Sequence, residues 1–251
     1  MLHRLVSRLR RRPAPPAPSG VARYIEVRQP HAYAPYDAAL YAALLRQIRA
    51  ATDLELAAFS SRRRPGGVKP RLYLRHDVDM AACVENLPLL LDVDLAEGIA
   101  PPVYIRTDGT DYPPEAVADA VAHYRAKGVE FGLHSSCYTE DDYIGAFRRE
   151  IGRFAECFGF RPASFTVHGL GSFRVEIRDR FAEEIVDRLP EFGLKFTDCN
   201  TRLRQYDYVI TDCHLEPETR RRYIYDDVVT LPRFFEPGRD YLVLTHPCYW
   251  R

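Results

Sequence analysis

Two aspartates, Asp77 and Asp79, lie two residues apart where a short apolar strand predicted over residues 71–75 ends. Side chains two positions apart at a strand end point the same way, so both carboxylates would face the pocket at the carboxyl edge of a parallel sheet. The two carboxylates of such a pair can have different roles: one binds a divalent metal and the other removes a proton. The alternative is a turn or capping pair before the helix expected from about Ala82.

Histidines close several of the later strands predicted along the chain. His76 ends the first strand with the aspartates, His134, His168 and His246 end others, and His214 lies just beyond another. A single histidine is more often a packing or capping residue, but several that converge at one barrel face favour a metal or acid–base site. Aspartate and neutral imidazoles with one open position are a normal ligand set for catalytic zinc and similar transition metals.

Apolar residues that recur every three or four positions predict helices, and short apolar runs between them predict strands. Helices are expected over 36–54, 82–97, 115–127, 141–158 and 175–189, and strands over 71–75, 102–106, 130–134, 163–167, 194–197, 207–211, 223–231 and 241–245. This alternation is typical of an α/β protein whose parallel sheet is covered by helices. The number of units favours a closed or partly closed (β/α) barrel over an open sheet.

The composition excludes some classes of protein. The 251 residues include 35 Lys+Arg and 35 Asp+Glu, and this balance argues against a general binder of nucleic acid or anionic membranes. A run of about 18 apolar residues is lacking, so no transmembrane helix is expected. The six cysteines form no Cys-x-x-Cys pair, which favours free thiols in a reducing compartment over a zinc ribbon or thioredoxin-like site.

Three regions are expected along the chain. Residues 1–22 read as a disordered basic, proline-rich tail, with weak binding to anionic lipid as the lesser alternative. The tail lacks the apolar segment of a secretory signal, so a cytoplasmic protein is expected. Residues 23–69 form an N-terminal helical extension and a basic linker, and residues 70–251 form the barrel.

The motifs of the barrel resemble those of the polysaccharide deacetylase superfamily, carbohydrate esterase family 4, also called the NodB homology domain. The resemblance covers about residues 70 to 250 and rests on Asp77-Val78-Asp79, His134-Ser135 and, loosely, on the run from Leu242 to His246 and Pro247. A divergent branch with His-Asp-Val-Asp, Gly-Leu-His and a later His-Gly is closer to this chain.

The resemblance implies a distorted (β/α) barrel of about seven parallel strands that removes N-acetyl or O-acetyl groups from sugars. It also implies that Asp77 is the catalytic base, Asp79 a metal ligand and His246 the catalytic acid.

Two departures from the family pattern bear on the metal. Tyr138 stands where the second metal histidine of the family motif belongs, and Thr166-Val167-His168-Gly169 replaces an arginine motif whose arginine orients the base. We infer that His168 restores the missing ligand, so that the set becomes Asp79, His134 and His168. Zinc is the expected metal, with cobalt, nickel or iron as alternatives.

Other residues have two interpretations each. His76 either contacts the metal ligands and helps to orient them, or packs under the site. Arg106 and Asp212 contact sugar hydroxyls or a carboxylate, or else belong to a surface salt bridge or a turn. Tyr249 and Trp250 stack on a sugar ring or pack at the chain end.

The function expected from these observations is hydrolysis of an acetyl amide or acetyl ester on a carbohydrate during bacterial surface polysaccharide synthesis. One alternative is a carbohydrate-binding barrel that has lost the metal chemistry, which Tyr138 and the missing arginine motif support. A second is a glycosyltransferase that uses the Asp-x-Asp pair, although no glycine-rich phosphate loop accompanies the pair. Tight metal binding without a nucleotide sugar would distinguish the first function from both alternatives.

Overall fold

A computed structural model describes residues 23–24, 38–51, 53–57, 68–169, 175–199, 206–212 and 235–250. Five α-helices are described, namely α1 (Ala38–Ala50), α2 (Ala81–Ala96), α3 (Ala118–Arg125), α4 (Tyr143–Phe158) and α5 (Val175–Val186). The described strands are β1 (Arg23–Tyr24), β2 (Glu55–Leu56), β3 (Arg71–Val78), β4 (Val103–Ile105), β5 (Phe131–Ser135), β6 (Ser164–Val167), β7 (Phe196–Thr197), β8 (Tyr208–Thr211) and β9 (Asp240–Thr245). Four short 3₁₀ turns join them, η3 (Pro114–Val117), η4 (Cys137–Thr139), η5 (Leu189–Phe192) and η7 (Pro247–Tyr249).

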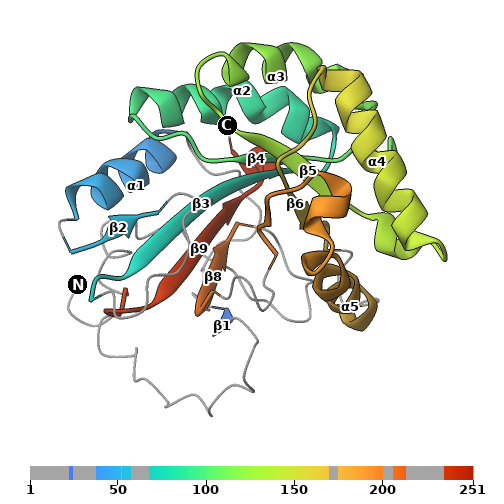
Figure 1. The fold of residues 1–251 in the computed structure, drawn as a ribbon. Helices are drawn as coiled ribbons and strands as arrows, with labels where there is room; N and C mark the ends of the chain where they lie inside the picture. The colour runs from blue at the N-terminus through green and yellow to red at the C-terminus, as the bar shows by residue number, and fades with distance from the viewer. Residues whose placement is uncertain are drawn as a thin grey trace, which may run out of the picture.

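The strands form one sheet in the order β1-β8-β9-β3-β4-β5-β6-β7, with β2 beside the start of β3, and every described pair is parallel. The sheet curls into a partly closed barrel with its helices outside, and Figure 1 shows α2, α3 and α4 along the outer face. The predicted α/β class and barrel are therefore confirmed. The strand expected over 223–231, the tail 1–22, the basic part of the linker and His214 lie outside the described residues.

Strand β3 lies in the middle of the sheet, between β9 and β4. It runs to Val78, beyond the predicted end at residue 75. Its alternate residues divide between two environments, as the pleat requires. Leu72 and Leu74 face outward and pack in a cluster with residues of α1 and α2. Tyr73 packs on the inner side with Tyr206, at a ring-centroid separation of 5.4 Å. Asp77 thus leaves the strand from the inner face, toward the barrel interior.

Helix α4 shows how sequence pattern fixes an element next to the site. Asp142 caps its first turn by accepting a hydrogen bond from the Gly145 N–H at 2.9 Å, and Gly159 ends it with φ of 74°. The apolar face of α4 packs onto the sheet, where Phe147 contacts Phe165 of β6 at a centroid separation of 5.0 Å. This packing holds α4 against β5, which contains His134, and β6, which His168 follows.

A buried polar network joins α1 to the barrel. The Tyr41 hydroxyl donates to Asp94 of α2 at 2.7 Å, and the same carboxylate lies 2.7 Å from His76 Nε2. His76 Nδ1 contacts the Thr245 hydroxyl on the neighbouring strand β9. The network fixes α1, α2, β3 and β9 together beneath the site. Among the described helices none combines the length and apolar character needed to cross a membrane.

Candidate metal centre

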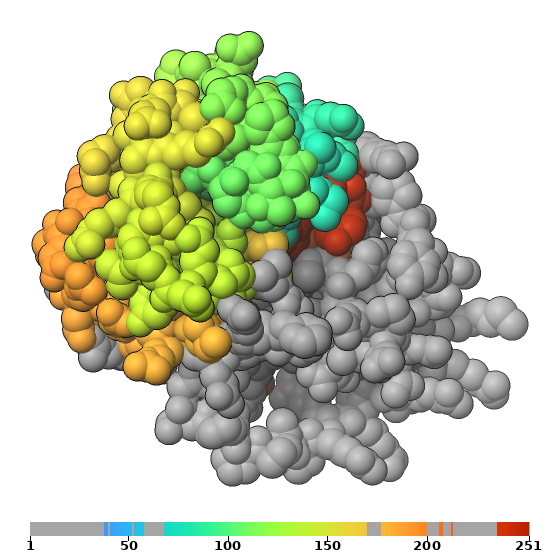
Figure 2. All heavy atoms as spheres, turned by 90° about the vertical axis from the view of Figure 1, so that its right-hand side faces the viewer, coloured from blue at the N-terminus to red at the C-terminus, as the bar shows by residue number. Residues whose placement is uncertain are grey.

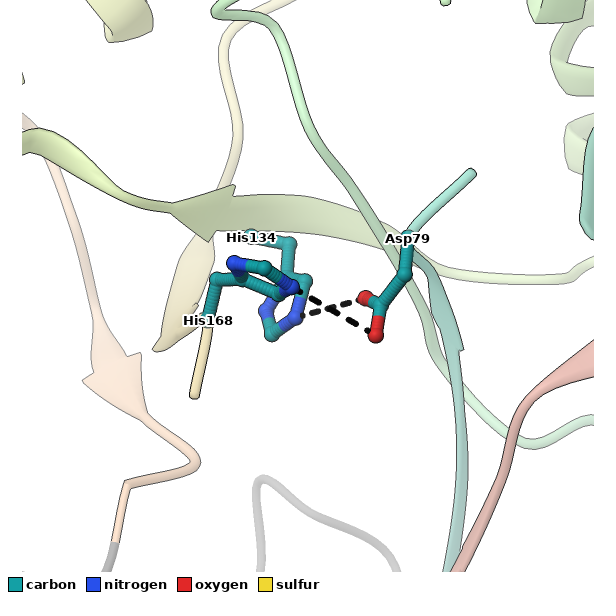
Figure 3. Close-up of side chains that lie close together, drawn as sticks. All are labelled: Asp79, His134 and His168. Carbon is teal, nitrogen blue, oxygen red and sulfur yellow. Dashed lines mark ion pairs between the residues drawn. The ribbon is translucent and has the colours of Figure 1, made fainter. Parts of the chain in front are cut away.

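Three side chains from the ends of three strands, β3, β5 and β6, meet at the carboxyl edge of the barrel. Asp79 follows β3, His134 lies in β5, and His168 follows β6. The Asp79 oxygens lie 3.0 Å from His134 Nε2 and 3.5 Å from His168 Nε2, and one ligand atom from each residue lies within 4.8 Å of the other two. Figure 3 shows both imidazoles pointing at the carboxylate. A carboxylate and two imidazoles in this arrangement fit the donor set of a divalent transition metal.

The electrostatics of the three groups suit metal binding. Burial would raise the pKa of Asp79, but His246, His134 and His168 outweigh it and hold that pKa well below its usual range. Burial lowers the pKa of His134, despite the attraction of Asp77 and Asp79, so its imidazole is neutral at pH 7. An ionised carboxylate and a neutral imidazole are the protonation states that metal coordination requires. Asp79 Oδ1 is buried with His134 Nε2 3.0 Å away, so a cation held between the two groups would bind both.

Asp77 lies beside the three groups and is held by Arg75 of the same strand. The Arg75 guanidinium donates to Asp77 Oδ2 at 2.9 Å, and that oxygen lies 3.6 Å from His134 Nε2. Arg75 also donates to Asp198 Oδ2 at 2.9 Å and to the Thr166 hydroxyl at 3.0 Å, across the barrel interior. Burial opposes its charge, but Asp77 and Asp198 outweigh this and raise the pKa of Arg75. Asp77 Oδ1 is buried and has no hydrogen-bond partner within the described residues.

His246 reaches the site from the end of β9, with its Nε2 3.4 Å from Asp79 Oδ2. Its Nδ1 lies 2.7 Å from Asp212 Oδ1, and the other Asp212 oxygen accepts hydrogen bonds from the His246 backbone and from Trp250 Nε1. Asp212 is only 2% exposed and both its oxygens are bound by His246 and Trp250, so its position matches neither the sugar contact nor the surface salt bridge that the sequence suggested. Trp250 is fully buried and packs with Tyr41, which contradicts its expected stacking on substrate.

Tyr138, which stands where the resembled deacetylase motif has a histidine, contacts the backbone of His168. Its ring is buried in η4, and its hydroxyl donates to the backbone carbonyl oxygen of His168 at 2.7 Å. A tyrosine in this position therefore fixes the backbone from which His168 projects. Tyr138 and the proposed ligand His168 therefore belong to the same local structure.

Replacing Tyr138 by phenylalanine should lower the free energy of unfolding by about 1–3 kcal/mol, because the His168 carbonyl loses its donor. Zinc affinity should fall with it by about tenfold, since the backbone of a proposed ligand is released. Urea unfolding and a zinc competition titration measure the two effects. Tyr124→Phe is the matched control, because the Tyr124 hydroxyl, which lies 2.9 Å from Asp92 Oδ1 and 3.1 Å from the Pro88 carbonyl oxygen, bonds residues of α2 and its loss should leave zinc binding unchanged. Equal zinc affinity in both variants would contradict the role given to Tyr138.

Two further residues expected near the site, His76 and Arg106, have well-defined partners in the structure. His76 is fully buried and has Asp94 and Thr245 as hydrogen-bond partners, and none of the three proposed ligands is among its described contacts. Arg106 is 5% exposed, donates to the backbone oxygen of Asp79 at 3.1 Å and pairs with carboxylates of the following loop. Arg106 therefore forms salt bridges, but from a buried position and not at the surface as the alternative interpretation expected.

Tyr249 remains a candidate for substrate contact. Its ring is half-buried, and its centroid lies 5.9 Å from the His246 ring.

Glu150 of α4 is a buried carboxyl group that fixes the segment after His134. It accepts hydrogen bonds from the Ser135 hydroxyl and, at 3.3 Å, from the Ser136 N–H. Burial raises the pKa of Glu150 to about 7. The residue thus ties α4 to the end of β5 on the side opposite Asp79.

Sequence inspection missed Arg75, Asp198 and Glu150. A usable signal existed for Arg75, because a charged residue two positions before Asp77 in a buried strand shares its face. Asp198 follows β7 as the other site residues follow their strands. Glu150 interrupts the apolar face of α4, and neither its partners nor its burial can be read from spacing.

Comparisons with known proteins identify no family for the chain. No protein-family model matches it, and no curated protein does. Among solved structures it is similar to a CE4 family pseudoenzyme from Bacillus anthracis, with a TM-score of 0.42 and 13% sequence identity over 78% of this chain. The chain spans 60% of the length of that protein. A likeness this distant assigns neither family nor activity, which leaves the geometry of the strand ends as the basis for function.

Proposed function

We propose that this chain is a metal-dependent deacetylase that hydrolyses an acetyl amide or ester on a sugar. The observation that carries the proposal is the meeting of Asp79, His134 and His168, with Asp77 and His246 beside them. Three protein ligands leave a coordination position open for water or substrate, as catalytic sites require. The motif resemblance to polysaccharide deacetylases supports the choice of reaction.

The metal, with zinc the expected one, would be held by the three side chains and would polarise the acetyl carbonyl and activate a water. Asp77 takes the proton of that water on Oδ1, the oxygen without a hydrogen-bond partner in the described structure, while Arg75 holds Oδ2. His246 gives a proton to the departing nitrogen or oxygen of the sugar. Asp212 binds its Nδ1, which keeps Nε2 directed at the site. The products are acetate and a free amine or hydroxyl.

The substrate class proposed is an acetylated carbohydrate of bacterial surface polysaccharide synthesis, on the strength of the motif resemblance. Polymeric, lipid-linked and nucleotide-linked sugars fit the proposal equally. Acetate release from an N-acetylated hexosamine oligomer, an N-acetylated nucleotide sugar and an O-acetylated sugar therefore has to be measured side by side.

The first experiment is zinc binding by the purified chain and by His168→Ala. The parent should bind about one zinc ion per chain. The variant should bind it more than about tenfold more weakly, because one of three ligands is lost. His123→Ala is the matched control, since His123 is exposed on α3 and its loss should change nothing.

Parent-like zinc affinity in His168→Ala would show that His168 is not a ligand. A parent that binds no zinc after reconstitution would support the carbohydrate-binding alternative, and zinc that binds only with a nucleotide sugar would support the glycosyltransferase.

A further inference from the structure

The loop after β4, residues 106–112, contacts the segments that carry two of the proposed ligands. Strand β4 lies between β3 and β5 in the sheet, and none of its residues is among the three proposed ligands. Asp79 follows β3 and His134 lies in β5, so the end of β4 stands between them. Figure 2 shows the green region of the chain, to which this loop belongs, between teal and yellow-green regions at the surface.

On the β3 side, the loop holds two successive backbone carbonyl groups. The β3–β4 ladder ends with the pair Val78 and Ile105. Beyond this pair the Tyr112 hydroxyl donates to the Val78 carbonyl oxygen at 2.8 Å and accepts from the Arg106 N–H at 3.1 Å. The Arg106 guanidinium then donates to the carbonyl oxygen of Asp79 at 3.1 Å. Two buried side chains of the loop therefore hold the backbone at Asp79.

On the β5 side, Asp108 joins the same arginine to the segment after His134. Asp108 Oδ2 accepts a hydrogen bond from Arg106 Nη2 at 2.6 Å and another from the Ser136 hydroxyl. The backbone N–H of Ser136 donates to Glu150 of α4 at 3.3 Å, so this segment is itself held from below. Arg106, Asp108 and Ser136 thus form a continuous connection between the two ligand segments, which we call the rim bridge.

We propose that Arg106 and Tyr112 are positioning residues of the metal centre. Together with Asp108 they set the position of Asp79 relative to His134. The carboxylate and the imidazole lie 3.0 Å apart and have to keep their spacing to share one metal ion. Because β4 separates β3 from β5, the sheet fixes this spacing only indirectly, and the rim bridge fixes it at the site itself. This inference rests on the proposed metal site.

Arg106→Lys is the first test. Lysine keeps the positive charge, but one ammonium group replaces a guanidinium that binds the Asp79 carbonyl and Asp108 through different nitrogens. The zinc affinity of the full chain should fall about tenfold in a competition titration. The visible spectrum of the chain loaded with Co²⁺ should also change, because the absorption bands of cobalt follow its coordination geometry. A merely structural role would lower stability and move neither quantity.

Arg71→Lys is the matched control, because Arg71 is a similarly buried arginine at the opposite end of β3. Its guanidinium donates to Asp240 at 2.8 and 2.7 Å. The control should be less stable than the parent in urea, yet keep the zinc affinity and cobalt spectrum of the parent. Tyr112→Phe removes a single hydroxyl and serves even where Arg106→Lys does not fold. It should weaken zinc binding about tenfold, whereas Tyr124→Phe should not.

Ser136→Ala cuts the rim bridge at its other end and leaves the backbone hydrogen bond to Glu150 in place. This variant should also bind zinc more weakly than the parent. Combining it with Arg106→Lys should add little, because the bridge is already broken. Fully additive losses of zinc affinity would show that the two ends do not act as one connection.

Parent-like zinc affinity and cobalt spectra in both Arg106→Lys and Tyr112→Phe would overturn the inference. If His168→Ala loses zinc in the same series, the proposed metal centre stands and only the positioning role fails. A parent chain that binds neither zinc nor cobalt would overturn the proposed function and this inference together.

Discussion

Asp77→Asn is expected to lower the deacetylation rate by about 10²–10⁴-fold, the usual contribution of a general base, while the protein keeps its zinc. Asparagine has nearly the same shape as aspartate, and its carbonyl oxygen still accepts the hydrogen bond that Arg75 donates. It cannot take a proton from water. Asp77 also lies outside the group of three residues whose ligand atoms converge, so zinc should be retained.

The measurement is acetate release at saturating zinc, with zinc content determined on the same sample. Asp108→Asn is the matched control, because Asp108 is a carboxylate at the rim that binds Ser136 and Arg106, and its loss should have a smaller effect. An Asp77→Asn protein that deacetylates at the parent rate would show that the base lies elsewhere. One that loses zinc would make Asp77 a ligand.

Arg75→Met is expected to lower the free energy of unfolding by about 3–5 kcal/mol, the usual effect of removing one partner from a buried ion pair. Two carboxylates, Asp77 and Asp198, would be left buried without their cation. Adding Asp198→Asn to Arg75→Met should recover part of this loss, since one uncompensated charge is removed. Asparagine at this position can still accept the hydrogen bond from the Tyr206 hydroxyl.

Urea unfolding of the parent, both single variants and the double variant gives the coupling between Arg75 and Asp198. We expect the double variant to be more stable than Arg75→Met alone. Strictly additive effects would mean that the two charges do not act as a pair, although their atoms lie 2.9 Å apart. Zinc is removed with a chelator beforehand, so that stability and metal binding are not confused.

Periodic sequence patterns predicted the elements of this fold well. Helix α4 was recoverable because Ile144, Phe147, Ile151 and Phe154 repeat at helical spacing and Gly159 follows. The end of β3 was placed too early, because buried charged residues do not look like strand residues until their partners are known. The two-residue strands β1 and β2 carry too little pattern to be seen.

The candidate site was predictable to the extent that its residues follow strands. Strand ends suggested a set of aspartates and histidines, and the motif resemblance narrowed it to Asp79, His134 and His168 as ligands, which the structure brings together. Trp250 and Asp212 were ambiguous, since sequence position does not reveal burial or which carboxylate lies behind which histidine. The same limit hid Arg75, whose partners on β6 and after β7 are brought near only by the curl of the sheet.

The layer formed by Arg75, Thr166, Asp198 and Tyr206 has a consequence for traffic through the proposed active site. It lies beneath Asp77, and the buried Tyr73 and Leu242 pack with Tyr206, so buried side chains occupy the described part of the barrel under the site. Under the proposed function, acetate and the deacetylated sugar therefore leave from the carboxyl edge of the sheet, where the substrate also arrives, so each turnover must clear that edge before the next can begin.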